Sequence, residues 1–245
     1  MQWSGSPSSN GGVGGDDPSP AREASPGQRT NSSGWALVAF AVGYNVTHHN
    51  GLLGTFQGPT GTRIADWIDL LTPFAVLLPL AWFLSLHRPK RLWVAAGIGS
   101  MLYVEGHGIH LSANSIGNVA SLCSATQRTT DVIHLWDEVV GHYIWFLGLA
   151  IVLAVAATAV RGRPLDLPDT AMAAGGALTG LTWATNGLEG GTAVFSLVCA
   201  LGAVAMVDRR RTGLSVALLA GGTVAVAVIA GFGIVHGGFP QPSSL

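Results

Sequence analysis

The stretch LWVAAGIGSMLYVEGHGIHLSAN, residues 92–114, combines a membrane-spanning length with ionisable side chains. A helix crosses a bilayer with about 20 mostly apolar residues, and this stretch has that length and composition. Glu105, His107 and His110 interrupt the apolar run. A charge near the centre of such a helix costs about 2.5 to 3.5 kcal/mol on insertion scales, so residues of this kind usually pair inward and mark a functional site. The stretch therefore predicts both a membrane fold and the place where its chemistry lies.

The composition of the whole chain agrees with a membrane protein. Of its 245 residues, 49% are hydrophobic and 10% are charged, whereas soluble domains carry about 25% charged residues. The mean hydropathy is +0.44. A net charge of −1 offers no basic surface, which excludes nucleic acid as a partner. Eleven of the twelve cations are arginine, and with the richness in Ala, Gly and Val this indicates a GC-rich bacterial genome and the bacterial cytoplasmic (inner) membrane.

Charged or Gly/Pro-rich breaks divide the chain into apolar segments. The segments are 35–54, 68–86, 92–113, 131–160, 170–187, 190–207 and 213–236. The first is short and the fifth is rich in Gly and Thr, so we predict an all-α, polytopic helical membrane bundle of six to seven transmembrane helices over residues 35–236. Residues 1–34 are dominated by Ser, Gly and Pro and predict a disordered tail, and residues 237–245 form a short C-terminal segment. The small-residue stretches MAAGGALTG and LLAGGTVAVAVIAG predict close helix packing.

Basic residues predict the orientation, because Lys and Arg accumulate in cytoplasmic loops. The loops HRPKRL, RGRP and DRRRT follow the second, fourth and sixth segments and hold eight of the twelve cations. The tail is therefore expected to be cytoplasmic and the C-terminus outside. This topology places seven of the eight histidines in the outer half of the membrane and leaves His87 alone at the cytoplasmic edge.

Depth along the third and fourth segments groups their polar residues into rungs. We assume that the outer ends lie at Asn114 and Asp131 and count inward at about 1.5 Å per residue. Three pairs of residues then lie at similar depths. Glu105 and His142 lie about 13 and 16 Å deep, His107 and Glu138 about 10 Å, and His110 and His134 about 5 to 6 Å. We call each such pair of side chains at matching depth a rung.

Helical spacing predicts which of these side chains share a face, since residues three, four or seven apart lie on the same side of a helix. One set is His107, His110 and Asn114, and the facing set is His134, Asp137 or Glu138, and His142. Because Asp137 and Glu138 are adjacent, at most one faces the cluster squarely. Glu105 is turned from His107 by about 200° and is expected to face another neighbour, as an acid or base or as an anchor.

Imidazole and carboxylate groups at this spacing are what a helical bundle offers a metal ion. The predicted ligands are His107, His110, His134, Glu138 and His142. The predicted catalytic acids and bases are Glu105, Asp137 and Glu138, with His48, His49, His236 and Asn114 as peripheral candidates. Neutral histidine favours zinc or iron, with copper as another option. Asp66 and Asp69 are interpreted as helix-start residues favoured by the helix dipole.

The pattern favours a metal-dependent membrane enzyme that acts on a membrane lipid or another lipophilic molecule. Two chemistries fit: a hydrolase with metal-activated water, or an oxidoreductase with two metals or a haem. A metal or proton-coupled transporter is an alternative, although the ionisable residues stop about halfway across the membrane and leave no continuous polar path. A metal-free isomerase or cyclase with Glu105 and Asp137 as acid and base is a further alternative.

Overall fold

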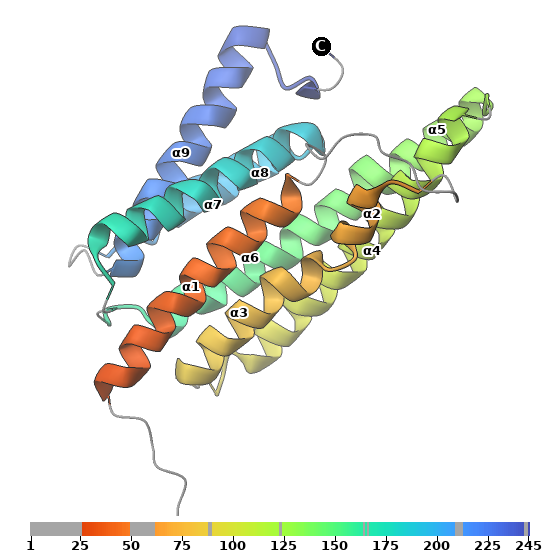
Figure 1. Ribbon diagram of the computed structural model, residues 1–245. Helices are drawn as coiled ribbons and strands as arrows, with labels where there is room; N and C mark the ends of the chain where they lie inside the picture. The colour runs from red at the N-terminus through yellow and green to blue at the C-terminus, as the bar shows by residue number, and fades with distance from the viewer. Residues whose placement is uncertain are drawn as a thin grey trace, which may run out of the picture.

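The computed structural model describes residues 26–49, 62–87, 90–122, 124–163, 165, 167–208, 213–242 and 245. This part of the chain is helical, which confirms the predicted all-α class (Figure 1). Its helical segments are α1 (Pro26–His48), α2 (Ile64–Asp69), α3 (Thr72–His87), α4 (Trp93–Leu122), α5 (Gln127–His134), the π-helix η2 (Leu135–Gly141), α6 (His142–Ala159), α7 (Asp169–Glu189), α8 (Ala193–Ala205) and α9 (Gly213–His236).

Three helical stretches within the described residues are long and apolar enough to cross a membrane. They are Ile64–His87, which joins α2 and α3, Gln127–Ala159, which joins α5, η2 and α6, and Gly213–His236, which is α9. Large apolar side chains point outward along the bundle: Met101 is 73% exposed and Ile234 is 82% exposed. Soluble monomers rarely expose contiguous apolar surface on this scale. These features indicate a membrane protein.

The predicted segment boundaries hold at the C-terminal end and fail at two other places. Helix α9 matches the predicted segment 213–236. Helix α1 begins at Pro26, inside the segment 1–34 predicted to be disordered, while residues 1–25 lie outside the described part of the chain. Helix α4 continues to Leu122 instead of ending at 113, because its last turns pack on α5, where Gly117 faces Ile133.

Helix α4 packs along α6 and η2 through glycines. A Cβ atom at Gly106 would lie 2.7 Å from the Gly141 carbonyl oxygen and 2.8 Å from Trp145 Cα, and one at Gly148 would lie 2.8 Å from Tyr103 Cα. Backbones can approach this closely only where side chains are absent. The glycines therefore set the register of α4 against α6.

A second glycine crossing joins α7 and α9. A Cβ atom at Gly180 would lie 2.7 Å from the carbonyl carbon of Gly221, and one at Gly176 would lie 2.7 Å from Ala217 Cα. This contact confirms the predicted close packing of the small-residue stretches. Helix α1 lies between α3 and α7 and packs against both, as Figure 1 shows, and α3 in turn contacts α4 and α6.

Candidate metal centre

Three ionisable side chains converge where α4 meets η2 and α6. They are His110 of α4, Asp137 of η2 and His142, the first residue of α6. One ligand atom from each lies within 4.8 Å of the other two, and Asp137 and His142 are buried. Within the described residues, this is the set of His, Cys, Asp or Glu side chains close enough to hold a metal ion. The sequence placed all three in the outer half, and the structure brings them together.

The π-helix explains how Asp137 and His142 reach the same partner. In an α-helix, residues three or four apart share a face and residues five apart do not. The wider π turn aligns residues five apart, and such turns are frequent at functional sites. Accordingly, the His142 Nδ1 atom lies 2.9 Å from the Asp137 carbonyl oxygen. Both side chains are therefore directed towards α4.

The closest contact in this group is 2.6 Å, between Nδ1 of His110 and Oδ1 of Asp137. The two atoms form a buried ion pair with each other, and neither has a further hydrogen-bond partner in the described residues. A proton shared between the imidazole and the carboxylate would hold such a pair together. A metal ion could take the place of that proton, because imidazole nitrogen and carboxylate oxygen are both metal ligands.

Glu138 lies beside this group rather than inside it. Its Oε2 atom is 3.4 Å from Nδ1 of His142 and has no hydrogen-bond partner among the described residues. The side chain is half-buried. Glu138 is therefore positioned next to the ligand group, as a carboxylate that could accept a proton there, while Asp137 makes the close approach.

His107, although three residues from His110 on the same helix, has a different partner. Its Nε2 atom donates to the Asp69 carbonyl oxygen at 3.0 Å and lies 3.5 Å from Asp69 Oδ1. Asp69 ends α2, and the last carbonyl groups of a helix have no partner within it. His107 therefore ties α4 to the break between α2 and α3, and the structure does not place it in the ligand group.

The predicted rungs are wrong. His134 and Glu105 are exposed, and His110 lies opposite Asp137 and His142 instead of opposite His134. Helix α4 extends past the assumed end at Asn114, and the extra residue of the π turn shifts the register of the residues after it. The pairings Glu105 with His142 and His107 with Glu138 fail for the same reasons.

The peripheral candidates separate into two groups. His48 and Asn114 line a cavity beside the ligand group. His49 instead bonds to the Asn45 carbonyl oxygen at 2.9 Å, and His236 is exposed and makes a tilted ring contact with Phe232. Only the first group is in a position to take part in chemistry at this site.

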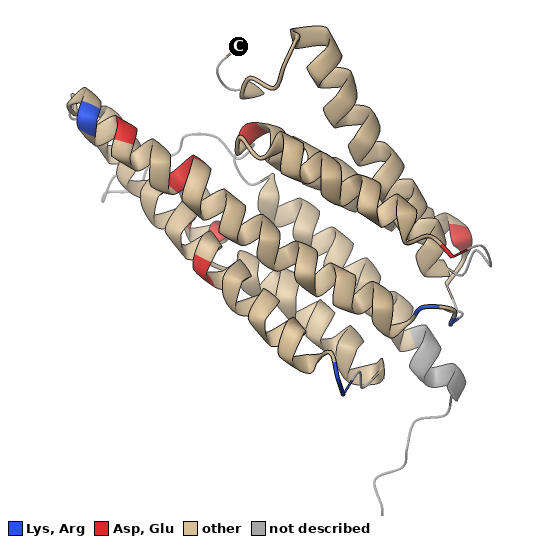
Figure 2. Ribbon diagram, turned by 180° about the vertical axis from the view of Figure 1, so that it is seen from behind, with Lys and Arg blue, Asp and Glu red and all other residues tan. Residues whose placement is uncertain are grey.

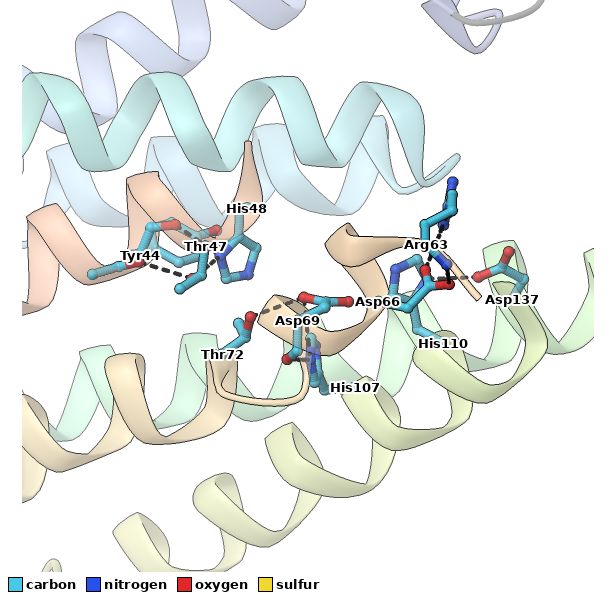
Figure 3. Close-up of polar contacts among 11 residues, drawn as sticks. Tyr44, Thr47, His48, Arg63, Asp66, Asp69, Thr72, His107, His110 and Asp137 are labelled. Carbon is cyan, nitrogen blue, oxygen red and sulfur yellow. Dashed lines mark hydrogen bonds and ion pairs between the residues drawn. The ribbon is translucent and has the colours of Figure 1, made fainter. Parts of the chain in front are cut away.

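The cavity has a volume of about 130 Å³ and brings together residues that are distant in sequence. Its lining consists of Thr47, His48, Arg63, Ala65, Asp66, Asp69, His110, Asn114, Trp145 and Asn186. Figure 3 shows Asp66 and Asp69 between His48 and His110. The cavity therefore adjoins the ligand group through His110, which belongs to both.

Asp66 and Asp69 were interpreted only as helix-start residues. Asp66 does have that role, since its Oδ2 atom accepts from the Arg63 backbone N–H at 2.9 Å and its Oδ1 atom pairs with the Arg63 guanidinium at 2.8 Å. Both residues also line the cavity. Their spacing of three residues, which puts them on one helical face, was the signal in the sequence that could have identified them.

Comparison with known proteins does not identify the chain: no family model matches it, and no curated protein or solved structure shows significant similarity. Function therefore has to be argued from the chemistry of the site itself.

Proposed function

We propose that the protein is a metal-dependent membrane enzyme with one metal ion at His110, Asp137 and His142. The observation that carries this proposal is the convergence of two imidazoles and a carboxylate in the bundle, with one ligand atom from each within 4.8 Å of the other two. A buried group of this kind is costly to maintain in a helical bundle. Coordination of a cation offsets that cost.

The number of ligands favours hydrolysis over oxidation. A catalytic zinc ion uses three protein ligands and keeps one position open for water, whereas di-iron sites in helical bundles use about six mixed ligands. The described group supplies three, with Glu138 next to His142 as a general base for the attacking water. A metal ion at this position would lower the pKa of its bound water. Within the membrane, a lipid or another lipophilic molecule is the proposed substrate.

We further propose that the helical segments form six or seven spans, with the N-terminus in the cytoplasm and the metal site opening outward. Support comes from the cations of the α3–α4 and α6–α7 turns, Lys90, Arg91, Arg161 and Arg163, which lie at the end of the bundle away from α5 (Figure 2). Lys and Arg accumulate on the cytoplasmic side.

Cysteine labelling tests this topology. Thr130→Cys and Arg161→Cys are made in a background without Cys123 and Cys199, and intact cells are treated with a membrane-impermeant maleimide. Labelling of Thr130→Cys in intact cells, and of Arg161→Cys only after permeabilisation, is expected. The reverse pattern would contradict the orientation.

Cobalt titration tests the metal site. Protein purified in detergent and stripped with a chelator is titrated with Co²⁺, whose visible absorption reports the coordination of a zinc-type site. We expect saturation at about one equivalent, displacement by zinc and loss of the bands in His142→Ala. The same bands in His142→Ala, or no saturable binding in the wild type, would overturn the site.

An activity screen and a flux assay test the function. A panel of fluorogenic lipid esters and amides should include one that the metal-loaded protein hydrolyses, with activity lost in the stripped protein and restored by zinc. Metal-dependent ion flux into proteoliposomes, without hydrolysis of any panel member, would favour the transporter over the enzyme.

A further inference from the structure

Glu105 lies on the outer face of α4, at an edge of the bundle (Figure 1). Its side chain is exposed and has no ion pair or hydrogen bond within the described part of the chain. The neighbouring side chains on this face are apolar: Met101 is 73% exposed and Val104 is 47% exposed. In water an exposed carboxyl group is ordinary, so the meaning of Glu105 depends on its depth in the membrane.

The packing of α4 on α6 gives that depth. Gly106 lies against the backbone of Trp145, so Glu105 is level with the start of α6, inside a helical stretch that is long and apolar enough to cross a membrane. The nearest exposed charged residues along that stretch are Asp131 and Arg161. At about 1.5 Å per residue, they lie about 21 and 24 Å from Trp145. Since the hydrocarbon core is about 30 Å thick, Glu105 is close to its middle.

A carboxyl group at this depth needs a partner. Ionisable residues in membrane helices almost always face the bundle interior or a water-filled cavity, or pair with one another. Glu105 faces outward and does not line the cavity beside the ligand group. Its partner therefore comes from outside the described part of the chain.

Glu105 distinguishes α4 from the other helices with exposed apolar faces. Helices α3 and α9 expose large apolar side chains, such as Leu78 and Ile234. Neither helix has an ionisable residue before its last position, which is a histidine in both. Lipid chains can cover those two faces without burying a polar group, whereas they cannot satisfy the carboxyl group on α4.

The chemistry of the carboxyl group indicates a second copy of this chain as the partner. In apolar surroundings such a group binds a proton rather than keeping its charge. It then has one O–H donor and a free acceptor oxygen. Two of these groups satisfy each other when they meet, and a twofold axis places the same residue of each copy opposite its counterpart. Polar side chains do hydrogen-bond across membrane helices in this way.

The surface around Glu105 permits the close approach that such a pair requires. The same helical face carries Gly97, Gly108 and Ser112, which are eight, three and seven residues away. A Cβ atom at Gly97 or Gly108 would meet nothing within 4 Å. The Ser112 hydroxyl donates to the Gly108 carbonyl oxygen at 2.8 Å, within its own helix. A second helix can therefore lie against this face with its backbone close to that of α4.

We propose that the protein is a homodimer in the membrane, in which the α4 faces of two copies meet and the two Glu105 carboxyl groups hydrogen-bond to each other. The inference goes beyond the proposed metal-dependent function and does not need a bound metal. It rests on the proposed membrane crossing of α4 beside α6.

Energy transfer in liposomes measures this association. Full-length chains carry a donor or an acceptor dye on Thr130→Cys, in a background without Cys123 and Cys199, and are reconstituted together at several lipid-to-protein ratios. We expect energy transfer that unlabelled wild type competes away, and a dimer weakened about tenfold or more in Glu105→Leu. Glu105→Gln should keep the dimer, because a carboxamide also donates and accepts hydrogen bonds. No energy transfer above random proximity, or equal association in Glu105→Leu, would overturn the proposal.

Disulfide cross-linking in membranes locates the contact. In the same background, Gly108→Cys introduces a thiol on the α4 face, and Leu78→Cys introduces one on the 62% exposed surface of α3. With a membrane-permeant oxidant, Gly108→Cys should form a linked dimer and Leu78→Cys should not. The Gly108→Cys dimer should also decrease when Glu105→Leu is added. Equal cross-linking of the two cysteines, or cross-linking of Leu78→Cys alone, would contradict a contact through α4.

Failure of the dimer and failure of the metal site give different results. If cobalt binds to the purified protein but no energy transfer occurs, the dimer is wrong and the metal site stands. If energy transfer depends on Glu105 but no metal binds, the metal-dependent function is wrong and the dimer stands.

Discussion

Two helix crossings in this protein use the same packing and differ in what they enclose. At the α7–α9 crossing, Gly180 lies against the backbone of Gly221. At the α4–α6 crossing, Gly106 lies against Gly141 and Trp145. Among the described residues, only the second crossing also brings together buried ionisable side chains, His110, Asp137 and His142.

The difference separates structural packing from function. Close contact between glycines is sufficient to hold membrane helices together, as the α7–α9 crossing shows. The α4–α6 crossing adds a π-helix and ionisable side chains that packing does not require. Because such side chains are costly in a membrane helix and usually mark functional sites, we propose binding or catalysis at the second crossing and not at the first.

The largest effect is expected from Gly106→Ala at the α4–α6 crossing. The new methyl group would lie 2.7 Å from the Gly141 carbonyl oxygen, so α4 and α6 must separate. We expect a loss of about 1 to 3 kcal/mol in the free energy of unfolding together with a loss of bound metal. Thermal unfolding in detergent and elemental analysis measure the two effects. Gly108→Ala is the control, because a Cβ there meets nothing within 4 Å.

Gly180→Ala makes the equivalent change at the α7–α9 crossing. The methyl group would overlap the backbone of Gly221, so a similar loss of about 1 to 3 kcal/mol in stability is expected. Metal bound per folded molecule should remain at the wild-type level. If Gly180→Ala releases metal while the protein is still folded, the two crossings are not functionally distinct.

Gly190→Ala is expected to act on the metal site with little effect on stability. Gly190 follows α7, and a Cβ there would lie 2.6 Å from Cγ and 2.7 Å from Nε2 of the His142 ring, which must then tilt. Displaced supporting contacts typically cost metal affinity about 10- to 100-fold. Cobalt titration of Gly190→Ala beside Gly202→Ala, where a Cβ meets nothing, measures this change. Unchanged cobalt affinity would show that the turn after α7 does not position His142.

The smallest effects are expected from Glu105→Gln and His134→Ala. Both side chains are exposed, outside the ligand group, and exposed substitutions usually change stability little. Thermal midpoints and metal content should match those of the wild type. A loss of metal in either variant would return that residue to the site and restore the pairing that the sequence predicted.

The sequence predicted those features that depend on local patterns. The continuous apolar run before His236 predicted the bounds of α9, and the spacing of small residues predicted its contact with α7. Ionisable residues inside apolar segments are costly to bury in a membrane, and this identified His110, Asp137 and His142 as candidate site residues.

The sequence did not predict the register between helices, because that register depends on contacts distant along the chain. The approach of Gly106 to Gly141 and Trp145 sets which α4 residue faces His142. The π turn has no distinctive sequence pattern, so the partner of His110 was misassigned. The cavity combines Asp69, His48 and Asn186 from separate helices, which spacing along one helix cannot reveal.

The metal content of purified protein tests the central claim most directly, with His110→Ala and His107→Ala as matched variants on one helix. His110 approaches Asp137, whereas His107 bonds to the Asp69 carbonyl oxygen. We predict about one equivalent of metal per folded molecule in the wild type and in His107→Ala, and less than about a tenth in His110→Ala. Less than about a tenth of an equivalent in the wild type, or equal loss in both variants, would contradict the assignment of the metal to His110, Asp137 and His142.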